Sequence, residues 1–238
     1  MKPLHAIATA ALLGTLACSS NDPAPAGSDG SLQASPEGPV SPVDHPPIDP
    51  GKGPITSAEP RRLTVDQLRR SFPIALGKDQ NGEDITWKVA GNKKGLDQNA
   101  DTLGEADYII TTEEILEPSP LYLKFADDAA RSICDQALAS DFTKATPADR
   151  TILRRVEKAD TVQTNPAGVD DNLRYLALRM HGVKVADDDA ATVEPLRTLF
   201  TSTVDAFAAG GAPTEDHIKE GWRVVCVALL TAPEFHIY

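Results

Sequence analysis

The sequence predicts a mainly α-helical protein, a bundle-like array of four to six amphipathic helices with one short extended segment near residues 84–89. Aromatic residues make up only 5% of the chain, and its apolar residues are mostly Ala, Leu and Val, a composition that favours helices over a β-sandwich. Several stretches with apolar residues at helical spacing follow a capping residue. No unit of about 20 to 50 residues recurs, so a solenoid is not predicted.

The first predicted elements are a helix and the extended segment. Thr64 begins the helix, Phe72 lies on its apolar face, and Pro73 kinks or ends it. Residues 84–89, DITWKV, alternate apolar and polar side chains, as a short strand does. We expect residues 91–104 to form a loop.

Five further helices are predicted from their caps. These caps are Ser119, Thr146, Asn165, Thr192 and Thr214, and the first three are each followed by a proline suited to the first helical turn. The residues expected to face inward are, helix by helix, Leu121, Phe125, Ala129, Ile133 and Ala137; Ile152, Leu153 and Val156; Val169, Leu173, Leu176 and Met180; Leu196, Phe200, Val204 and Phe207; and Ile218, Trp222, Val225 and Leu229.

Residues 1–17 are predicted to be a signal peptide. The apolar run within them spans about twelve residues, which is too short to cross a bilayer. Cys18 follows a small residue, and the stretch LLGTLACSS resembles a bacterial lipobox, although Thr15 stands where that pattern usually has Leu. The resemblance implies that Cys18 becomes lipidated and anchors an exported protein to the cell envelope, at the outer membrane. The alternative is an ordinary signal peptide with an incidental cysteine.

Residues 18–60 are predicted to be a disordered tether. This segment is rich in Pro, Ser and Gly, is net acidic, and has only isolated apolar residues, so it cannot bury enough surface to offset its ordering entropy. As a flexible coil it would span roughly 35 Å. Residues 61–238 are then long enough for a single helical domain with its own core.

The charge of the chain excludes some classes of partner. The formal net charge is −12, whereas nucleic-acid binding needs a concentrated basic face. The same acidity disfavours electrostatic attraction to anionic lipids, so the lipid on Cys18 would have to hold the protein at the bilayer.

The two remaining cysteines form an even pair once Cys18 is set aside. In an oxidising compartment we expect Cys134 and Cys226 to form a disulfide that joins two helices and closes a loop of about 90 residues. The alternative is two buried free thiols.

Other clusters of chemically able residues have simpler interpretations. Asp97, Asn99 and Asp101 have the spacing of the first calcium ligands in an EF-hand loop, but the glycine and the glutamate of that motif are missing. We expect Asp127 and Asp128 to form a solvated helix edge, since adjacent helical residues point in different directions. We expect the acidic run 187–189, DDD, to favour a helix N-terminus. No catalytic residue or cofactor is predicted.

Two stretches of the body resemble one group of proteins. RRLTVDQLRRSFPIALG at residues 61–77 and VVCVALLTAPEF at residues 224–235 resemble the opening and the close of helical domains of unknown function in large exported bacterial cytochrome-type proteins. The resemblance implies an exported helical domain in an envelope-associated system. Those proteins carry haem through C-x-x-C-H, which this chain lacks, so an electron-transfer role is not implied.

The sequence therefore favours a non-enzymatic function. We expect a membrane-tethered exported lipoprotein that binds an envelope protein partner or serves as an accessory component of an envelope assembly. The alternative is an exported hydrolase-like enzyme whose acidic site is assembled from scattered carboxylates and histidines. The sequence names neither the partner nor a substrate.

Overall fold

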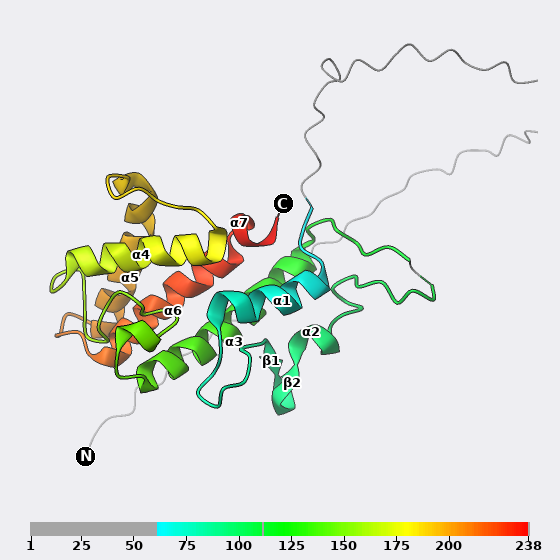
Figure 1. Cartoon of the computed structure of the whole chain (residues 1–238), viewed down its shortest axis with the longest axis horizontal. Coiled ribbons are helices and arrows are strands. Elements are labelled where there is room, and N and C mark those ends of the chain that lie inside the picture. Colours follow the sequence, from blue (N-terminus) through cyan, green and yellow to red (C-terminus); the bar gives the residue numbers. More distant parts are fainter. Residues whose placement is uncertain (1–60, 111, 238) are drawn as a thin grey trace, which may run out of the picture. The chain divides into compact units, whose positions relative to one another are not determined.

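A computed structural model describes residues 61–110 and 112–237, and it is mainly helical, as predicted (Figure 1). The predicted signal peptide, Cys18 and the tether lie outside the described residues. The elements are α1 (Val65–Leu76), β1 (Lys88–Val89), the 3₁₀ turn η1 (Ala90–Asn92), β2 (Lys93–Lys94), α2 (Gly95–Gln98), α3 (Pro120–Thr143), the 3₁₀ turn η2 (Pro147–Asp149), α4 (Pro166–His181), α5 (Ala190–Ala208), α6 (Glu215–Thr231) and α7 (Pro233–His236).

The long helices pack around α6. It contacts α3 on one side, and α5 and α4 on others, while α1 lies against α3 (Figure 1). Helices α5 and α6 approach closely at Gly221, where an added Cβ would lie 2.7 Å from Val204 and 2.9 Å from the ring of Phe200. One continuous apolar core, which includes the fully buried Trp222, joins these helices to α1 and to the segment before α2.

The caps of three predicted helices are confirmed. The side chains of Ser119, Asn165 and Thr214 each accept a hydrogen bond from the backbone N–H three residues later. The cap of α5 was wrongly predicted: Asp189 caps it, and Thr192 donates to that carboxylate instead.

Helix α1 begins after Thr64 as expected but continues through Pro73 to Leu76. Leu121 and Phe207 are exposed rather than inward, and each sits in a terminal turn of its helix.

The region between α1 and α3 is more ordered than predicted. The extended segment at 84–89 buries Ile85 and Trp87, but only Lys88–Val89 pairs as a strand, antiparallel to Lys93–Lys94. The predicted loop at 91–104 holds β2 and the single-turn helix α2, whose glycine lies against the Trp87 ring. The long remainder of this connection, up to α3, projects from the body as a loop (Figure 1).

The helix predicted from Thr146 is wrong beyond one 3₁₀ turn. Ile152, Leu153 and Val156 are buried as expected, but their backbone is irregular. Its hydrogen bonds go to side chains of neighbouring helices: the carboxylate of Asp141 on α3 accepts from the N–H groups of residues 151–153. Such side-chain partners satisfy a buried backbone without a helical ladder.

Candidate functional site

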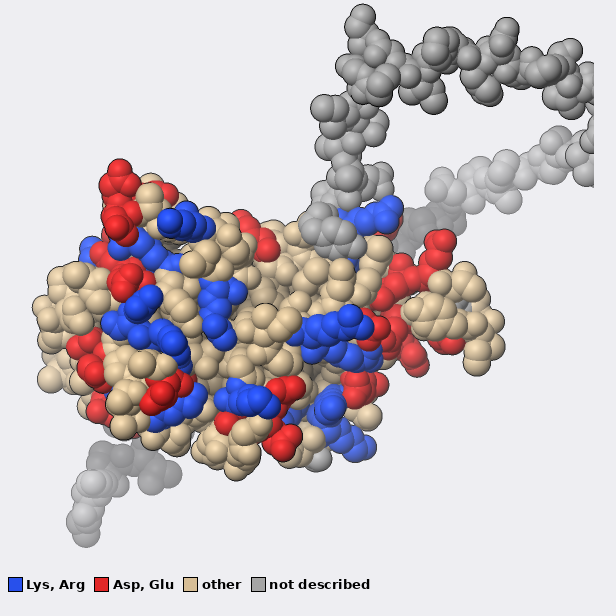
Figure 2. All heavy atoms as spheres, viewed as in Figure 1, with Lys and Arg blue, Asp and Glu red and all other residues tan. Residues whose placement is uncertain are grey.

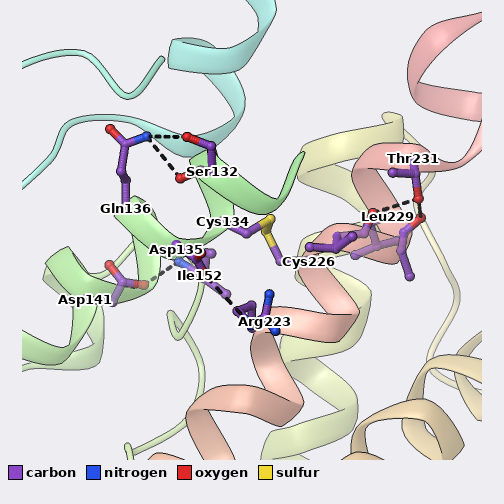
Figure 3. Close-up of a disulfide and its surroundings, with 12 residues drawn as sticks. Ser132, Cys134, Asp135, Gln136, Asp141, Ile152, Arg223, Cys226, Leu229 and Thr231 are labelled. Atoms are coloured by element: carbon purple, nitrogen blue, oxygen red, sulfur yellow. Dashed lines mark hydrogen bonds and ion pairs between the residues drawn. A yellow bond between two sulfur atoms is a disulfide. The ribbon is translucent and has the colours of Figure 1, made fainter. Parts of the chain in front are cut away.

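The predicted cysteine pair lies between α3 and α6. The sulfur atoms of Cys134 and Cys226 are 2.06 Å apart, and their Cα atoms are 6.0 Å apart (Figure 3). Both residues are fully buried, and they are 92 positions apart in the chain. The structure thus brings together the two cysteines that the sequence pairs. Because both are fully buried between α3 and α6, the disulfide links two helices and is not exposed to a ligand.

Two of the three calcium candidates have other partners. Asp97 accepts from Arg69 at 2.9 Å, and the side-chain amide of Asn99 donates to the carbonyl of Gly95 at 2.8 Å. Asp101 is exposed in the turn that follows α2. Within residues 61–110 and 112–237, no group of three or more His, Cys, Asp and Glu side chains is placed to hold a metal ion.

The aspartate pairs have structural surroundings. Asp127 accepts from Arg131, and Asp128 pairs with Lys124, both as one-turn ion pairs on the partly exposed face of α3. Asp189 is the N-cap of α5, and hydrogen bonds from Thr192 lower the pKa of this carboxyl. Asp127, Asp128 and Asp189 thus make the contacts of a helix surface and a helix cap, as expected.

A cleft of about 320 Å³ lies between α1 and the segment that runs from Lys78 to α2. Phe72 and Pro73 of α1 form one wall, and Trp87 and Leu96 lie across from them. The entrance is charged and of mixed sign. A cleft of this size is at the lower end of the range for small-molecule sites.

Arg69 is fixed at the edge of the cleft by three carboxylates. It pairs with Glu105 at 2.5 Å, Asp66 at 2.8 Å and Asp97 at 2.9 Å. The hydrogen bonds to Glu105, which has the largest effect, and to Asp66 and Asp97 raise the pKa of this guanidinium above its usual high value. Because three carboxylates hold it, the Arg69 side chain is a fixed part of the cleft lining and not a group that is free to move towards a ligand.

A second polar cluster is buried where the two ends of the body meet. The OH of Tyr122 lies 2.9 Å from Nδ1 of His236, and Nε2 of that imidazole lies 2.6 Å from the carbonyl of Leu230. Because a carbonyl only accepts, Nε2 carries the proton and Nδ1 accepts from the tyrosine. Burial lowers the pKa of His236 and raises that of Tyr122 to about 12, so both are neutral near pH 7.

Arg62 links this cluster to the projecting loop. Its guanidinium is almost fully buried, lies 4.8 Å above the ring of Tyr122, and donates to the carbonyl of Leu103 and to Glu114. Glu114 also accepts from the N–H of Val65 at the start of α1. Arg62 therefore holds both ends of the loop that runs from Leu103 to Glu114.

The tip of that loop carries apolar side chains into solvent. Tyr108, Ile109 and Ile110 are 78%, 90% and 86% exposed. Asp107 fixes their backbone, since its carboxylate accepts from the N–H groups of both isoleucines. Tyr108 has a positive φ of 57°, an unfavourable conformation for a bulky residue.

Neither the buried arginine nor the apolar tip was predicted from the sequence. The signal for the tip was present, since DYII is an apolar run inside a loop without helical spacing. Arg62 gives no such signal, because its acceptors lie 41 and 52 positions further along the chain.

The fold and these sites define a disulfide-linked, mainly helical domain with a small cleft and an apolar loop. Compared with protein-family models, curated proteins and solved structures, the chain has no match. None of the helices in the described part is long and apolar enough to cross a bilayer.

Proposed function

We propose that this protein is an exported lipoprotein, tethered to the cell envelope through Cys18, whose helical body binds an envelope protein through the loop tip Tyr108–Ile110. The observation that carries the proposal is the exposure of three consecutive large apolar side chains on a loop that is firmly held. Contiguous apolar surface exposed to solvent is typical of interaction sites. The unfavourable backbone of Tyr108 also fits a residue retained for the contact it makes.

The charge around the tip indicates the chemistry of the partner. Residues 95–123 contain no Lys or Arg but seven acidic residues, which are Asp97, Asp101, Glu105, Asp107, Glu113, Glu114 and Glu117. Figure 2 shows acidic side chains gathered where this loop leaves the body. Glu113 and Glu117 are exposed and pair with no described cation. The complementary surface is therefore an apolar pocket bordered by Lys and Arg on a protein.

An anionic membrane surface fits this loop poorly. Such a surface attracts clusters of Lys and Arg, and the acidic flanks of the tip would be repelled from it. The loop also lies next to the start of the body, since the N–H of Arg62 donates to the carbonyl of Leu116 at 3.0 Å. The first described residues therefore lie beside the base of the loop that carries the proposed binding surface.

The test places a photo-crosslinking amino acid at Ile109 of the full chain in intact cells. We expect one adduct of defined mass, weakened by raised salt because exposed charges are screened. The changes Tyr108→Ser and Ile110→Ser should each reduce the adduct about tenfold, since exposed aromatic and apolar anchors dominate such contacts. The same crosslinker at Phe207, which is also exposed but lies at the end of α5, is the matched control.

Two results would contradict the proposal. The first is an adduct pattern that is the same from positions 109 and 207. The second is tip-dependent binding of a Cys18→Ser variant to phosphatidylcholine vesicles without any protein adduct, which would make the tip a lipid contact instead.

A further inference from the structure

We infer that the cleft between α1 and the segment from Lys78 to Asp97 is a binding site for a free amino acid with an apolar side chain. This inference is independent of the loop and of the partner proposed above. It rests on the size of the cleft, the fixed apolar residues along it, and the signs of the charges at its entrance.

The apolar surface of the cleft is held rigidly before any ligand arrives. The Trp87 ring lies 5.6 Å from that of Phe125, at an interplanar angle of 54°. The ring also lies against Gly95, where an added Cβ would approach the indole to 2.3 Å, so only glycine permits this contact. Trp87 and Leu96 are only 4% and 5% exposed, so just an edge of each side chain reaches the cleft, and the adjoining Pro73 adds a partly exposed apolar surface. A preorganised apolar surface lowers the entropy cost of binding.

The charged groups at the entrance divide into paired and unpaired ones. Arg69 is paired with Asp97, and Lys78 is paired with Asp84 at 3.2 Å. The remaining lining charges are Glu83 and Lys94, and neither makes an ion pair with a described residue. They come from different segments, one from the turn before Trp87 and the other from β2.

One unpaired anion and one unpaired cation beside these apolar edges match a zwitterion with an apolar side chain. The carboxylate of Glu83 suits an α-ammonium group, and the ammonium of Lys94 suits an α-carboxylate. The apolar side chain of the ligand would then contact Pro73, Leu96 and the edge of Trp87. A volume of about 320 Å³ suits a ligand of this size rather than a folded partner.

The experiment uses the full chain and observes the two indole N–H signals by NMR. The protein has only two tryptophans, so Trp222, which is fully buried away from the cleft, is an internal control. We expect L-phenylalanine to shift the Trp87 signal saturably, with a dissociation constant of about 1 mM, and to leave the Trp222 signal in place. Phenethylamine and 3-phenylpropanoate each lack one of the two charges and should bind about fivefold more weakly.

Two charge reversals locate the ligand within the cleft. Glu83→Lys and Lys94→Glu should each weaken binding of L-phenylalanine about fivefold or more. Lys93→Glu is the matched control, since this neighbouring lysine is also exposed but does not line the cleft. The inference is overturned if L-phenylalanine at ~10 mM leaves Trp87 unshifted, if both indoles shift alike, or if the three ligands or the three variants behave the same.

Discussion

Asp141 offers the sharpest test of how this chain is held together. Its carboxylate is fully buried and accepts from three backbone N–H groups: Thr151 at 2.7 Å, Ile152 at 2.6 Å and Leu153 at 3.0 Å. Lys144 approaches the same oxygen as Thr151, at 3.4 Å. The change Asp141→Asn keeps the size of the side chain but leaves one acceptor oxygen in place of two.

The expected loss follows from these contacts. The best arrangement of the amide keeps its oxygen towards Ile152 and Leu153 and turns its NH₂ towards Thr151, which abolishes one bond and leaves a buried donor without an acceptor. A hydrogen bond to a charged group contributes about 1.5–3 kcal/mol, and the two bonds that remain lose their charge. We therefore expect the free energy of unfolding to fall by about 3 kcal/mol, with a drop in Tm of roughly 6–12 °C for a domain of this size.

Urea unfolding followed by circular dichroism measures this change, and hydrogen exchange locates it. The amides of residues 151–153 should lose protection before the rest of the core. Asp128→Asn, on the exposed face of the same helix, is the matched control and should cost about 0.5 kcal/mol or less. If Asp141→Asn costs no more than this control while the three amides stay protected, the carboxylate does not hold the segment.

Three further predictions concern other contacts. Replacing Cys134 and Cys226 by Ala should lower the free energy of unfolding by about 4–5 kcal/mol, given the 92-residue separation, and non-reducing peptide mapping should find the two linked; free thiols at both in the unreduced protein would contradict this. Because burial lowers the pKa of His236, the unfolded chain takes up a proton before the folded chain as the pH falls below about 6.5. The free energy of unfolding, measured in urea, should therefore decrease from that pH down to the pKa of His236 in the folded protein, and His236→Gln should remove this part of the pH dependence. Gly95→Ala should cost about 1–3 kcal/mol and broaden the Trp87 indole signal, whereas unchanged stability would show that the ring can move aside.

Much of the helical structure could be predicted because its signals are local. The caps at Ser119, Asn165 and Thr214 bond to N–H groups three residues away, so the residues that begin each helix are adjacent to it in the sequence. The stop at Gly182 is equally local, since a left-handed residue with φ of 68° is needed there. Helical spacing of apolar residues then indicated which faces are buried.

The segment from Thr146 to Val156 shows where this reasoning stops. Its apolar spacing fits a helix, and its apolar side chains are indeed buried, but Asp141 and Asn172 supply the backbone partners that a helical ladder would have supplied. Periodicity reports which side chains are buried and does not report what the backbone bonds to. The competing acceptors come from two other helices and have no trace in the local pattern.

The sequence by itself determined the helical class and the caps at Ser119, Asn165 and Thr214, because these depend on composition and local spacing. It also predicted the pairing of Cys134 with Cys226, but on the expectation that Cys18 is lipidated and with two free thiols as the alternative, and it is the structure that pairs them. Tertiary structure decided the candidate binding surfaces, although the apolar run at residues 108–110 is visible in the sequence. The cleft forms only where α1 meets Trp87, and the loop tip is presented only because Arg62 reaches acceptors 41 and 52 positions away. Contacts between segments so distant in the chain depend on how the helices pack, and packing leaves no signature in any one stretch of sequence.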